Sequence, residues 1–274
     1  FTGGDPFKRE HFIELAKYAY FKGIEVGILG NPIEVSKIRQ IEKYVYDYQI
    51  SLDGTREVHD TIRGSDDAFD RAINTLNEFR NFNSKLRVMS TVSKRNISSV
   101  LELFEEISNL EFERFDFARF IPIENVENNR EDILNKNEYR KFLYDIFNKN
   151  MTSQIEVGTK EPLWSIILEN VGLIKTNDNK DKIYGGCSVG LNLLTVLPDG
   201  TCYPCRRLPI EIGQLPEESI RDVFIESEKL NELREFESIE KCGQCDLLPY
   251  CRGCRAMAYT VNGSYFNEDP NCWR

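Results

Sequence analysis

Histidine and positive charge are both scarce in this sequence. The 274 residues include two histidines, His11 and His59, which are too few for a histidine-rich metal site. Acidic residues outnumber basic residues, and the formal net charge is −10. Sequence-independent binding to nucleic acid needs a basic surface that displaces counterions from the phosphates. The composition therefore argues against a nucleic-acid partner.

Long apolar runs are also missing. No run approaches the roughly 20 apolar residues that span a bilayer, so we expect no membrane-spanning segment and a cytoplasmic protein. The chain begins at Phe1 rather than at methionine, inside the turn-like segment FTGGDP. We expect that it lacks its natural N-terminus, in which case a signal peptide would not be visible.

Cysteine is absent from residues 1–186 and abundant after them. All eight cysteines lie between Cys187 and Cys272. Eight cysteines scattered at random would all fall in that segment about once in ten thousand trials, so the cysteines form a set that needs an explanation.

The cysteine-free part alternates between strand and helix patterns. Runs of β-branched and aromatic residues predict strands over 25–29, 44–52, 85–92 and 112–121. Apolar residues at helical spacing predict helices over 8–22, after Asn31-Pro32, after Asp67, over 96–108 and over 136–149. Such alternation predicts a parallel sheet, because parallel neighbours need crossover helices. We prefer a barrel or part-barrel to an open doubly wound sheet, and in both the chemistry lies at the carboxyl ends of the strands.

Two boundaries follow from the composition. Residues 163–173 predict an apolar helix, and the charged loop TNDNKDK follows it. We therefore predict an α/β domain over 1–158, a helical linker over 159–186 and a cysteine-rich domain over 187–274.

The cysteines have a regular spacing. Two CxxC pairs lie close together in the segment CGQCDLLPYCRGC, namely Cys242 with Cys245 and Cys251 with Cys254. Upstream, an apolar stretch and the turn sequence Pro198-Asp199-Gly200 predict a β-hairpin, with Cys202 and Cys205 just beyond the turn. A charged helix is expected over 218–236. Two thiolates on one tight turn can reach the same ion or cluster.

Three kinds of site would use eight cysteines. Structural zinc takes four per ion, and iron–sulfur clusters also take four each. Disulfide frameworks belong to short secreted chains, which a cysteine-free α/β domain does not match. The spacing alone leaves zinc and iron–sulfur clusters open.

Three motifs together resemble radical S-adenosylmethionine (radical SAM) enzymes. FTGGDP resembles the GGEP segment of that family, and SLDG followed by HDTIRG resembles a later strand and its loop. The cysteine array resembles the SPASM domain, a C-terminal extension of many radical SAM enzymes that carries two auxiliary iron–sulfur clusters. Cys187, Gly200 and Cys205 fit the first part of its spacing; Cys242, Cys245, Cys251 and Cys272 fit the rest.

The sequence departs from the family pattern at three places. CRGC has two residues between its cysteines where three are commoner. Residue 206 is arginine, where anaerobic sulfatase maturases have a catalytic aspartate, and this sets that subfamily aside. The family's CxxxCxxC motif is expected upstream of Gly3, so this chain alone would be incomplete for catalysis.

The resemblance implies a fold and a set of cofactors. The fold would be α/β, a partial (β/α)6 TIM-like barrel whose first strand and cluster loop are missing here, followed by a small cysteine-rich α+β SPASM domain. The cofactors would be two auxiliary [4Fe–4S] clusters, with S-adenosylmethionine and a third [4Fe–4S] cluster in the complete protein.

The resemblance also implies roles for particular residues. Gly3, Gly4 and Asp5 would line the methionine amino group of S-adenosylmethionine, Ser51 would hydrogen-bond the cofactor, and Arg63 would pair with its carboxylate. Cys187, Cys205 and Cys254, with Cys202 as the fourth ligand, would hold the first auxiliary cluster. Cys242, Cys245, Cys251 and Cys272 would hold the second. Asp53 and Gly54 are interpreted as a turn, and His59 as a structural loop residue.

The implied activity is that of a radical SAM/SPASM oxidoreductase or maturase. A 5′-deoxyadenosyl radical would abstract hydrogen from a substrate, expected to be a ribosomally made peptide that receives a thioether or carbon–carbon crosslink. One alternative is an enzyme of tetrapyrrole (heme-type) biosynthesis. An alternative of another class is an electron-transfer or zinc-binding module without catalysis. The expected partners are a peptide and a reductant such as flavodoxin or ferredoxin.

Overall fold

The computed structural model describes residues 1–32, 35–79, 82, 84–110, 112–123, 126–158, 160–176 and 182–274. The chain divides into two compact units. Unit 1 comprises Phe1–Arg119 and Asp145–Gly158, and unit 2 comprises Phe120–Tyr144 and Thr159–Arg274. The domain boundaries expected at residues 158 and 186 stay a prediction.

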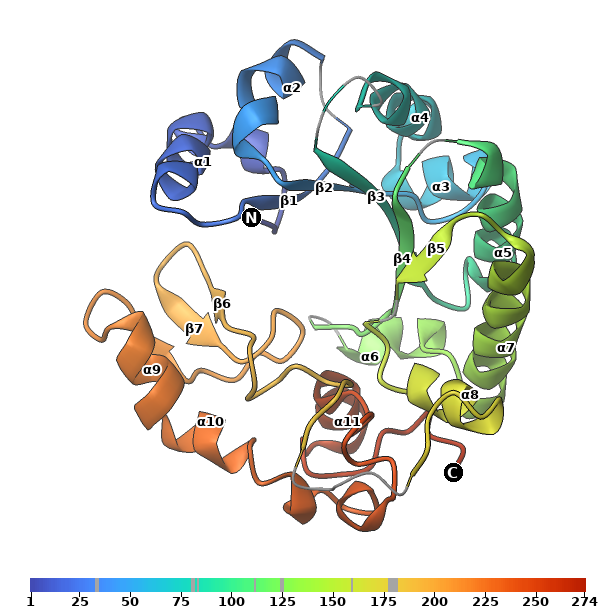
Figure 1. Cartoon of the computed structure of the whole chain (residues 1–274), viewed down its shortest axis with the longest axis vertical. Helices are drawn as coiled ribbons and strands as arrows, with labels where there is room; N and C mark the ends of the chain where they lie inside the picture. Colours follow the sequence, from blue (N-terminus) through green and yellow to red (C-terminus); the bar gives the residue numbers. More distant parts are fainter. Residues whose placement is uncertain are drawn as a thin grey trace. The chain divides into compact units, whose positions relative to one another are not determined.

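A five-stranded parallel sheet forms the centre of unit 1 (Figure 1). Its strands are β1 (Gly27–Gly30), β2 (Asp47–Ser51), β3 (Lys85–Val92), β4 (Arg114–Arg119) and β5 (Glu156–Gly158). They lie side by side in chain order, each parallel to the next. An open doubly wound sheet reverses its strand order at a switch point, whereas a barrel does not. The observed order therefore matches the predicted part-barrel.

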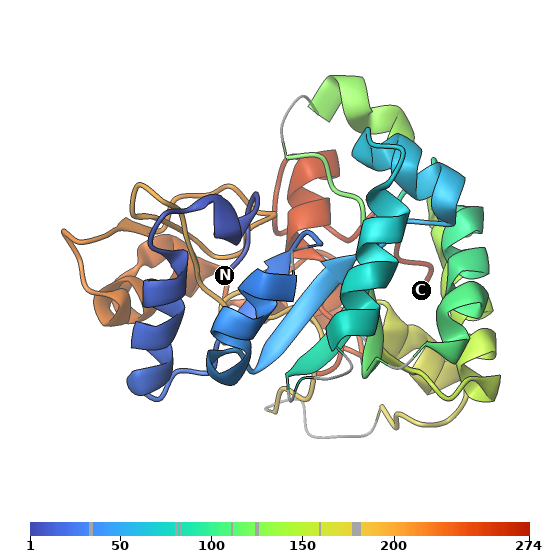
Figure 2. The same ribbon diagram turned by 90° about the horizontal axis from the view of Figure 1, so that it is seen from above.

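Helices cover the outer face of this sheet (Figures 1 and 2). They are α1 (Phe12–Phe21), α2 (Val35–Ile41), α3 (Arg56–Arg63), α4 (Ala68–Phe79) and α5 (Ile97–Glu106), and α7 (Lys136–Thr152) crosses the division between the units. The strand residues Tyr48, Ile50, Val88 and Phe115 are fully buried. Each such side chain contributes about 1.5–3 kcal/mol through burial, so this apolar layer accounts for much of the stability of unit 1.

The opposite face of the strands is polar. Arg87 on β3 donates from Nε to Asp47 Oδ1 at 2.8 Å and pairs with Asp116 Oδ2 at 3.1 Å. Arg114 Nε lies 2.9 Å from Asp116 Oδ1. Side chains alternate between faces along a strand, so Arg114 and Asp116 share one face of β4. Asp47, Arg87, Arg114 and Asp116 thus form a network of ion pairs on this face of the sheet.

The segment HDTIRG is helical, so its expected loop structure is wrong. His59 and Arg63 both lie on α3, one helical turn apart. Gly64 ends the helix with φ of +64°, a left-handed conformation that favours glycine at helix ends. The sequence does not indicate this helix, because His59 is its one buried residue and the segment therefore has no repeating apolar pattern.

Unit 2 contains short elements joined by loops. Its antiparallel sheet has β6 (Thr195–Val196), β7 (Thr201–Tyr203) and β8 (Gly213–Gln214), and its helices are α6 (Val126–Asn129), α8 (Trp164–Asn170), α9 (Ile220–Glu226), α10 (Glu228–Glu232) and α11 (Arg255–Asn262). The predicted hairpin is present, because β6 pairs with β7 around Gly200. The helix expected over 218–236 is two helices, because Ser227 accepts a hydrogen bond from Leu230 N and begins α10.

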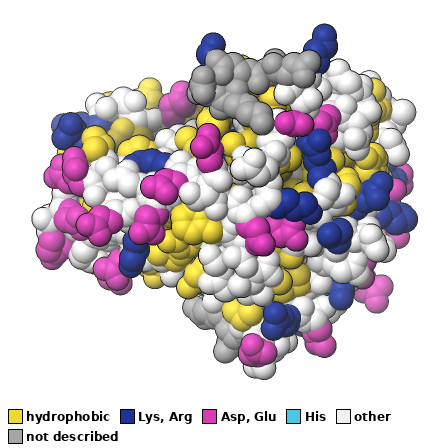
Figure 3. All heavy atoms as spheres, turned by 90° about the horizontal axis from the view of Figure 1, so that it is seen from below, with side chains coloured by type: hydrophobic (Ala, Val, Ile, Leu, Met, Phe, Trp, Pro, Cys, Tyr) yellow, Lys and Arg dark blue, Asp and Glu magenta, His cyan; other side chains and the backbone are white. Residues whose placement is uncertain are grey.

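Short 3-10 turns complete the described structure. They are η1 (Pro6–Lys8), η2 (Glu42–Tyr44), η3 (Ile107–Asn109), η4 (Arg130–Asp132), η5 (Phe236–Ser238) and η6 (Cys242–Gln244). None of the described helices combines the length and the apolar character that crossing a bilayer requires. On the face shown in Figure 3, acidic and basic side chains are interspersed.

Candidate cofactor cavity and cysteine sites

A cavity of about 800 Å³ lies in unit 1. Three of the predicted cofactor-binding residues, Asp5, Ser51 and Arg63, line it. Ser51 is the last residue of β2, so the cavity opens at the carboxyl end of a parallel strand, where barrels place their chemistry. Gly3 and Gly4 precede Asp5 with φ of +82° and +55°, values that favour glycine. Both glycines are exposed and neither lines the cavity.

Arg63 has a protein partner in addition to its place in the cavity. Its Nη2 donates to Asp53 Oδ2 at 2.5 Å. The Asp53 side chain is 6% exposed and the Arg63 side chain 32% exposed. A guanidinium carries five N–H donors, so the pair with Asp53 leaves others for a ligand. The pairing of Arg63 with a cofactor carboxylate stays a prediction.

Asp53 connects three parts of unit 1, so its interpretation as a simple turn residue was incomplete. Its Oδ1 accepts a hydrogen bond from Thr91 N at 2.8 Å, and its carbonyl accepts one from Asn96 Nδ2 at 2.7 Å. Its own N–H donates to His59 Nδ1 at 3.0 Å. The position of Asp53 two residues beyond Ser51, just past the end of a strand, was the available sequence signal.

His59 lies on α3 and lines the cavity, so its interpretation as a loop residue is wrong. It is 2% exposed and lines the same space as Arg63. Its Nδ1 accepts the hydrogen bond from Asp53, so the neutral ring suits the site. Burial lowers the pKa of His59, and the charge of Arg63 acts in the same direction while Asp53 opposes it.

The second predicted cysteine set lines one small cavity in unit 2. Cys242, Cys245, Cys251 and Cys272 all border it, although 30 residues separate the first from the last in sequence. Its remaining wall consists of apolar residues, one glycine and two arginines, namely Leu163, Ile166, Leu247, Leu248, Gly253, Arg252 and Arg274. A metal or cluster site with four thiol donors and a dry wall is chemically compatible with this set.

Burial favours the protonated form of three thiols in this cavity. Burial raises the pKa of Cys242 to about 11 and raises the pKa values of Cys251 and Cys272 as well. Thiolates are the form that binds metal, so loading the site must release protons. The Sγ of Cys251 also accepts a hydrogen bond from Gly253 N at 3.4 Å, and such N–H donors stabilise thiolate ligands.

The geometry does not choose between an ion and a cluster. Across the described ranges, no three His, Cys, Asp or Glu side chains converge closely enough for a single ion. The open space between the four cysteines is about 20 Å³, close to that of one water molecule. A single ion would require the thiols to move closer together, whereas a cluster would require more space between them, so the choice depends on the family to which the module belongs.

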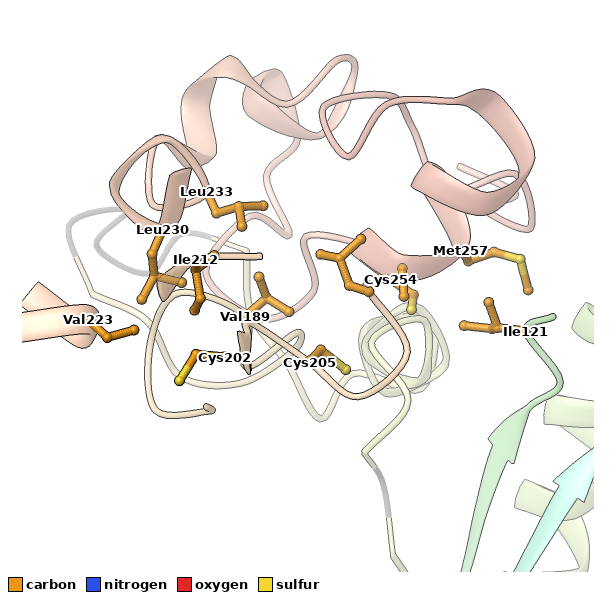
Figure 4. Packing of buried hydrophobic residues seen from close by; sticks show 12 residues of the cluster. Ile121, Val189, Cys202, Cys205, Ile212, Val223, Leu230, Leu233, Cys254 and Met257 are labelled. Atoms are coloured by element: carbon orange, nitrogen blue, oxygen red, sulfur yellow. The ribbon is translucent and has the colours of Figure 1, made fainter. Parts of the chain in front are cut away.

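The first predicted cysteine set lies in an apolar core of unit 2 (Figure 4). Cys202, Cys205 and Cys254 are buried in it, and Cys187 packs against it. In Figure 4 the sulfur atoms of Cys205 and Cys254 point toward the space between these two residues. The Sγ of Cys205 accepts a hydrogen bond from Arg207 N at 3.5 Å.

Cys202 differs from the other members of this set. It lies on β7, and its side chain points toward Val223 and away from Cys205 (Figure 4). Its thiol donates to the carbonyl of Gly200 at 3.6 Å. The assignment of Cys202 as a fourth ligand stays a prediction, and this conformation does not favour it.

Comparison with a family model identifies the cysteine-rich part. Residues 187–255 match SPASM, described as an iron–sulfur cluster-binding domain. This match includes seven of the eight cysteines, all but Cys272. The description favours iron–sulfur clusters over zinc.

Comparison with individual proteins covers almost the whole chain. The AdoMet-dependent heme synthase of Methanosarcina barkeri is 28% identical over 99% of this chain and 80% of its own length. The cysteine-type anaerobic sulfatase-maturating enzyme of Clostridium novyi is 27% identical over 99% of this chain and 74% of its own. AdoMet is S-adenosylmethionine.

The fold has counterparts among solved structures. SuiB of Streptococcus suis, in its complex with S-adenosylmethionine, superposes with a TM-score of 0.76 at 18% identity. The match covers 99% of this chain, and this chain spans 65% of the length of SuiB. Residues 187–255 therefore belong to the SPASM iron–sulfur cluster-binding domain. The chain as a whole is similar in sequence to an AdoMet-dependent heme synthase and in fold to a protein that was crystallised with S-adenosylmethionine.

Proposed function

We propose that this chain is the S-adenosylmethionine-binding and auxiliary-cluster part of a radical SAM enzyme. The observation that carries the proposal is that Asp5, Ser51 and Arg63, chosen from family motifs, border a single cavity at the end of β2. Polar and charged groups in that cavity suit a zwitterionic cofactor. Arg63 would bind its carboxylate by a charge-assisted hydrogen bond, with Asp53 holding the guanidinium in place.

The protein supplies position and dry surroundings, while the cofactors supply the radical chemistry. When bound, S-adenosylmethionine and a reduced cluster provide a 5′-deoxyadenosyl radical that abstracts a hydrogen atom from the substrate. An external one-electron donor such as flavodoxin or ferredoxin would supply the electron. The cysteines of unit 2 would hold two auxiliary clusters. The side chain of Cys202 points away from Cys205, so Cys202 is the one cysteine that we do not expect to be a ligand.

Two substrate classes follow from different observations. The sequence motifs led to a ribosomally made peptide, and the sulfatase-maturating relative is named for an action on a protein. Residue 206 is arginine, where the sequence resemblance leads us to expect a catalytic aspartate in sulfatase maturases, and this argues against the same reaction here. Tetrapyrrole chemistry is favoured by the heme synthase of M. barkeri, which has the higher identity of the two relatives. By sequence similarity the tetrapyrrole class has the stronger support.

Deuterium transfer tests the function and the substrate class together. Protein that includes the upstream cluster-binding segment would be incubated anaerobically with S-adenosylmethionine, a strong reductant and a deuterated candidate substrate. The proposal predicts 5′-deoxyadenosine that carries deuterium from one of the two substrates, an iron tetrapyrrole with propionate side chains or a cysteine-containing peptide. Absence of 5′-deoxyadenosine from protein with all its clusters would contradict the proposed activity.

A further inference from the structure

Two arginines are buried next to the cysteine sites. Arg252 is 2% exposed and Arg255 3% exposed, and they directly follow Cys251 and Cys254. Arginine stays protonated in proteins and is almost never fully buried unless its charge is paired. Each of these side chains therefore needs a nearby negative charge.

The described hydrogen bonds of Arg252 go to backbone carbonyls. Nη1 donates to Leu248 O at 3.0 Å, and Nη2 donates to Gly185 O at 2.5 Å and to Cys187 O at 2.9 Å. The guanidinium carbon lies 5.0 Å from the ring centre of Phe236. Nε is buried without a hydrogen-bond partner among the described residues. Carbonyl dipoles satisfy N–H groups but supply no full negative charge.

Arg252 touches both cysteine sets. Its side chain lines the cavity of Cys242, Cys245, Cys251 and Cys272, and its Nη2 bonds to the carbonyl of Cys187 in the other set. No other arginine of the described chain is placed in this way by the contacts that the structure shows. One guanidinium thus lies beside the ligands of both predicted clusters.

Arg255 has fewer hydrogen-bonded nitrogen atoms than Arg252 among the described residues. Nη1 donates to Tyr265 O at 2.5 Å and to Asn267 O at 2.9 Å, while Nε and Nη2 are buried without hydrogen-bond partners in the part of the chain that the structure describes. A Cβ added to Gly253 would lie 2.8 Å from Nη2. Gly253 borders the cysteine cavity, so this guanidinium packs directly behind the cavity wall.

The carboxylate near this wall has other contacts. Asp269 is 1% exposed, its Oδ2 accepts a hydrogen bond from Cys254 N at 2.8 Å and its Oδ1 accepts one from Asn271 N at 3.0 Å. One carboxylate cannot balance two buried guanidiniums. The bound clusters can, because thiolates bring more negative charge than the metal core brings positive charge. A ligated cluster is therefore anionic and becomes more so when it accepts an electron.

We propose that Arg252 and Arg255 are the counter-charges of the auxiliary clusters and keep their reduction potentials high. The proposal rests on the assignment of the cysteines to iron–sulfur clusters. An added electron is more stable beside a positive charge, so each guanidinium favours the reduced cluster. Arg252 acts on both clusters, and Arg255 acts on the cluster of Cys242, Cys245, Cys251 and Cys272.

A redox titration tests this without any need for catalysis. Anaerobically purified protein of known iron content would be titrated with dithionite, which gives up one electron for each cluster that is reduced, and the reduced clusters would be counted by electron paramagnetic resonance. In Arg252→Gln and Arg255→Gln the ratio of reduced to oxidised cluster at a fixed potential should fall on the order of tenfold, or ~59 mV for one electron. Arg252→Lys and Arg255→Lys keep the charge and should retain most of the wild-type potential.

Arg234→Gln is the matched control. Arg234 also donates to a carbonyl, that of Gly190 at 2.8 Å, and its guanidinium carbon lies 4.9 Å from the ring centre of Phe224. It does not border the cysteine cavity, so its substitution should leave the potential of the second cluster unchanged.

The outcomes separate this proposal from the assignment on which it rests. Unchanged potentials in both glutamine variants with full iron content would overturn the counter-charge role alone. If Arg252→Gln does not fold, Arg255→Gln decides the question. Wild-type protein without iron would overturn the cluster assignment as well.

Discussion

The cofactor cavity of unit 1 and the cysteine sites of unit 2 are built in different ways. Ser51, Asp53 and Arg63 are held by a strand end, the turn after it and a helix, and a hydrogen bond links Arg63 to Asp53. The cysteines lie largely on loops and short turns, with buried thiols and buried guanidiniums around them. Regular secondary structure positions the first site, whereas the second has little of it.

The two sites also differ in the source of their stability. The apolar layer of Tyr48, Ile50, Val88 and Phe115 stabilises unit 1 without any ligand. In unit 2, a bound cluster would supply the negative charge that the buried guanidiniums of Arg252 and Arg255 need. We therefore expect unit 1 to be preformed and unit 2 to depend on its cofactors for folding.

The largest effect is expected from Cys251→Ala. The substitution removes one ligand of the second cluster, so about half of the iron should be lost. Unit 2 should lose several kcal/mol of stability, because cluster ligation contributes to folding, while unit 1 stays folded. Hydrogen exchange resolved along the chain would measure both units in one experiment. Equal destabilisation of the two units would contradict the comparison.

Cys202→Ala is the matched cysteine control. The Cys202 thiol points away from Cys205 and donates to Gly200 O, so we expect full iron content and a stability loss of about 1 kcal/mol from the buried site. Loss of iron in this variant would show that Cys202 is the fourth ligand of the first cluster.

Arg63→Ala should have the next largest effect, on cofactor affinity. In protein that includes the upstream cluster-binding segment, S-adenosylmethionine should bind about 10- to 150-fold more weakly, or ~1.5–3 kcal/mol, because its carboxylate loses a charged partner. Arg63→Lys should restore part of the affinity, since lysine lacks the planar fork. Calorimetry measures the binding, and Arg56→Ala is the control on the same helix because Arg56 pairs with exposed Asp70. Equal affinity in wild type and Arg63→Ala would place the cofactor elsewhere.

Asp53→Asn should have a smaller effect, because it preserves shape and removes one charge. The variant keeps an oxygen for Thr91 N but weakens the hold on Arg63, so we expect about 3- to 10-fold weaker cofactor binding. Thermal unfolding and calorimetry on the same sample would separate a folding defect from a binding defect. A cofactor affinity equal to that of wild type would mean that Arg63 needs no positioning by Asp53.

The smallest expected effect is a pH dependence from His59. The pKa of His59 is lowered in the folded protein, so neutral His59 contributes stability that is present above its unfolded pKa of about 6.5. That contribution is lost as the pH falls through the lower folded pKa. His59→Asn keeps an acceptor for Asp53 N and does not titrate, so its stability should fall less than that of wild type between pH 7 and pH 5. Exposed His11, changed to asparagine, is the control.

The sequence predicted regular elements well where apolar residues repeat. The strand over 85–92 has the same bounds as β3, because its residues alternate between faces and are mostly buried. Short or polar elements were missed: α3 has one buried residue, and β5 has three residues in all. Contacts with the rest of unit 1 stabilise such elements. Their own sequences lack the apolar repeat that predicts a helix or a strand.

The sequence likewise predicted only part of the two candidate sites. The resemblance to the SPASM domain grouped Cys242, Cys245, Cys251 and Cys272 as one set, and these four residues border one cavity. The ion pair of Asp53 with Arg63 and the burial of Arg252 depend on contacts between distant segments. No spacing rule encodes such contacts, so the structure was needed to find them.

Elemental analysis tests the central claim most directly. Protein purified without oxygen should be brown and contain about eight irons per chain, if both auxiliary clusters are of the [4Fe–4S] type, with a matching amount of acid-labile sulfide. Colourless protein with two zinc ions and no iron would contradict the assignment of this chain to the cluster-binding radical SAM enzymes.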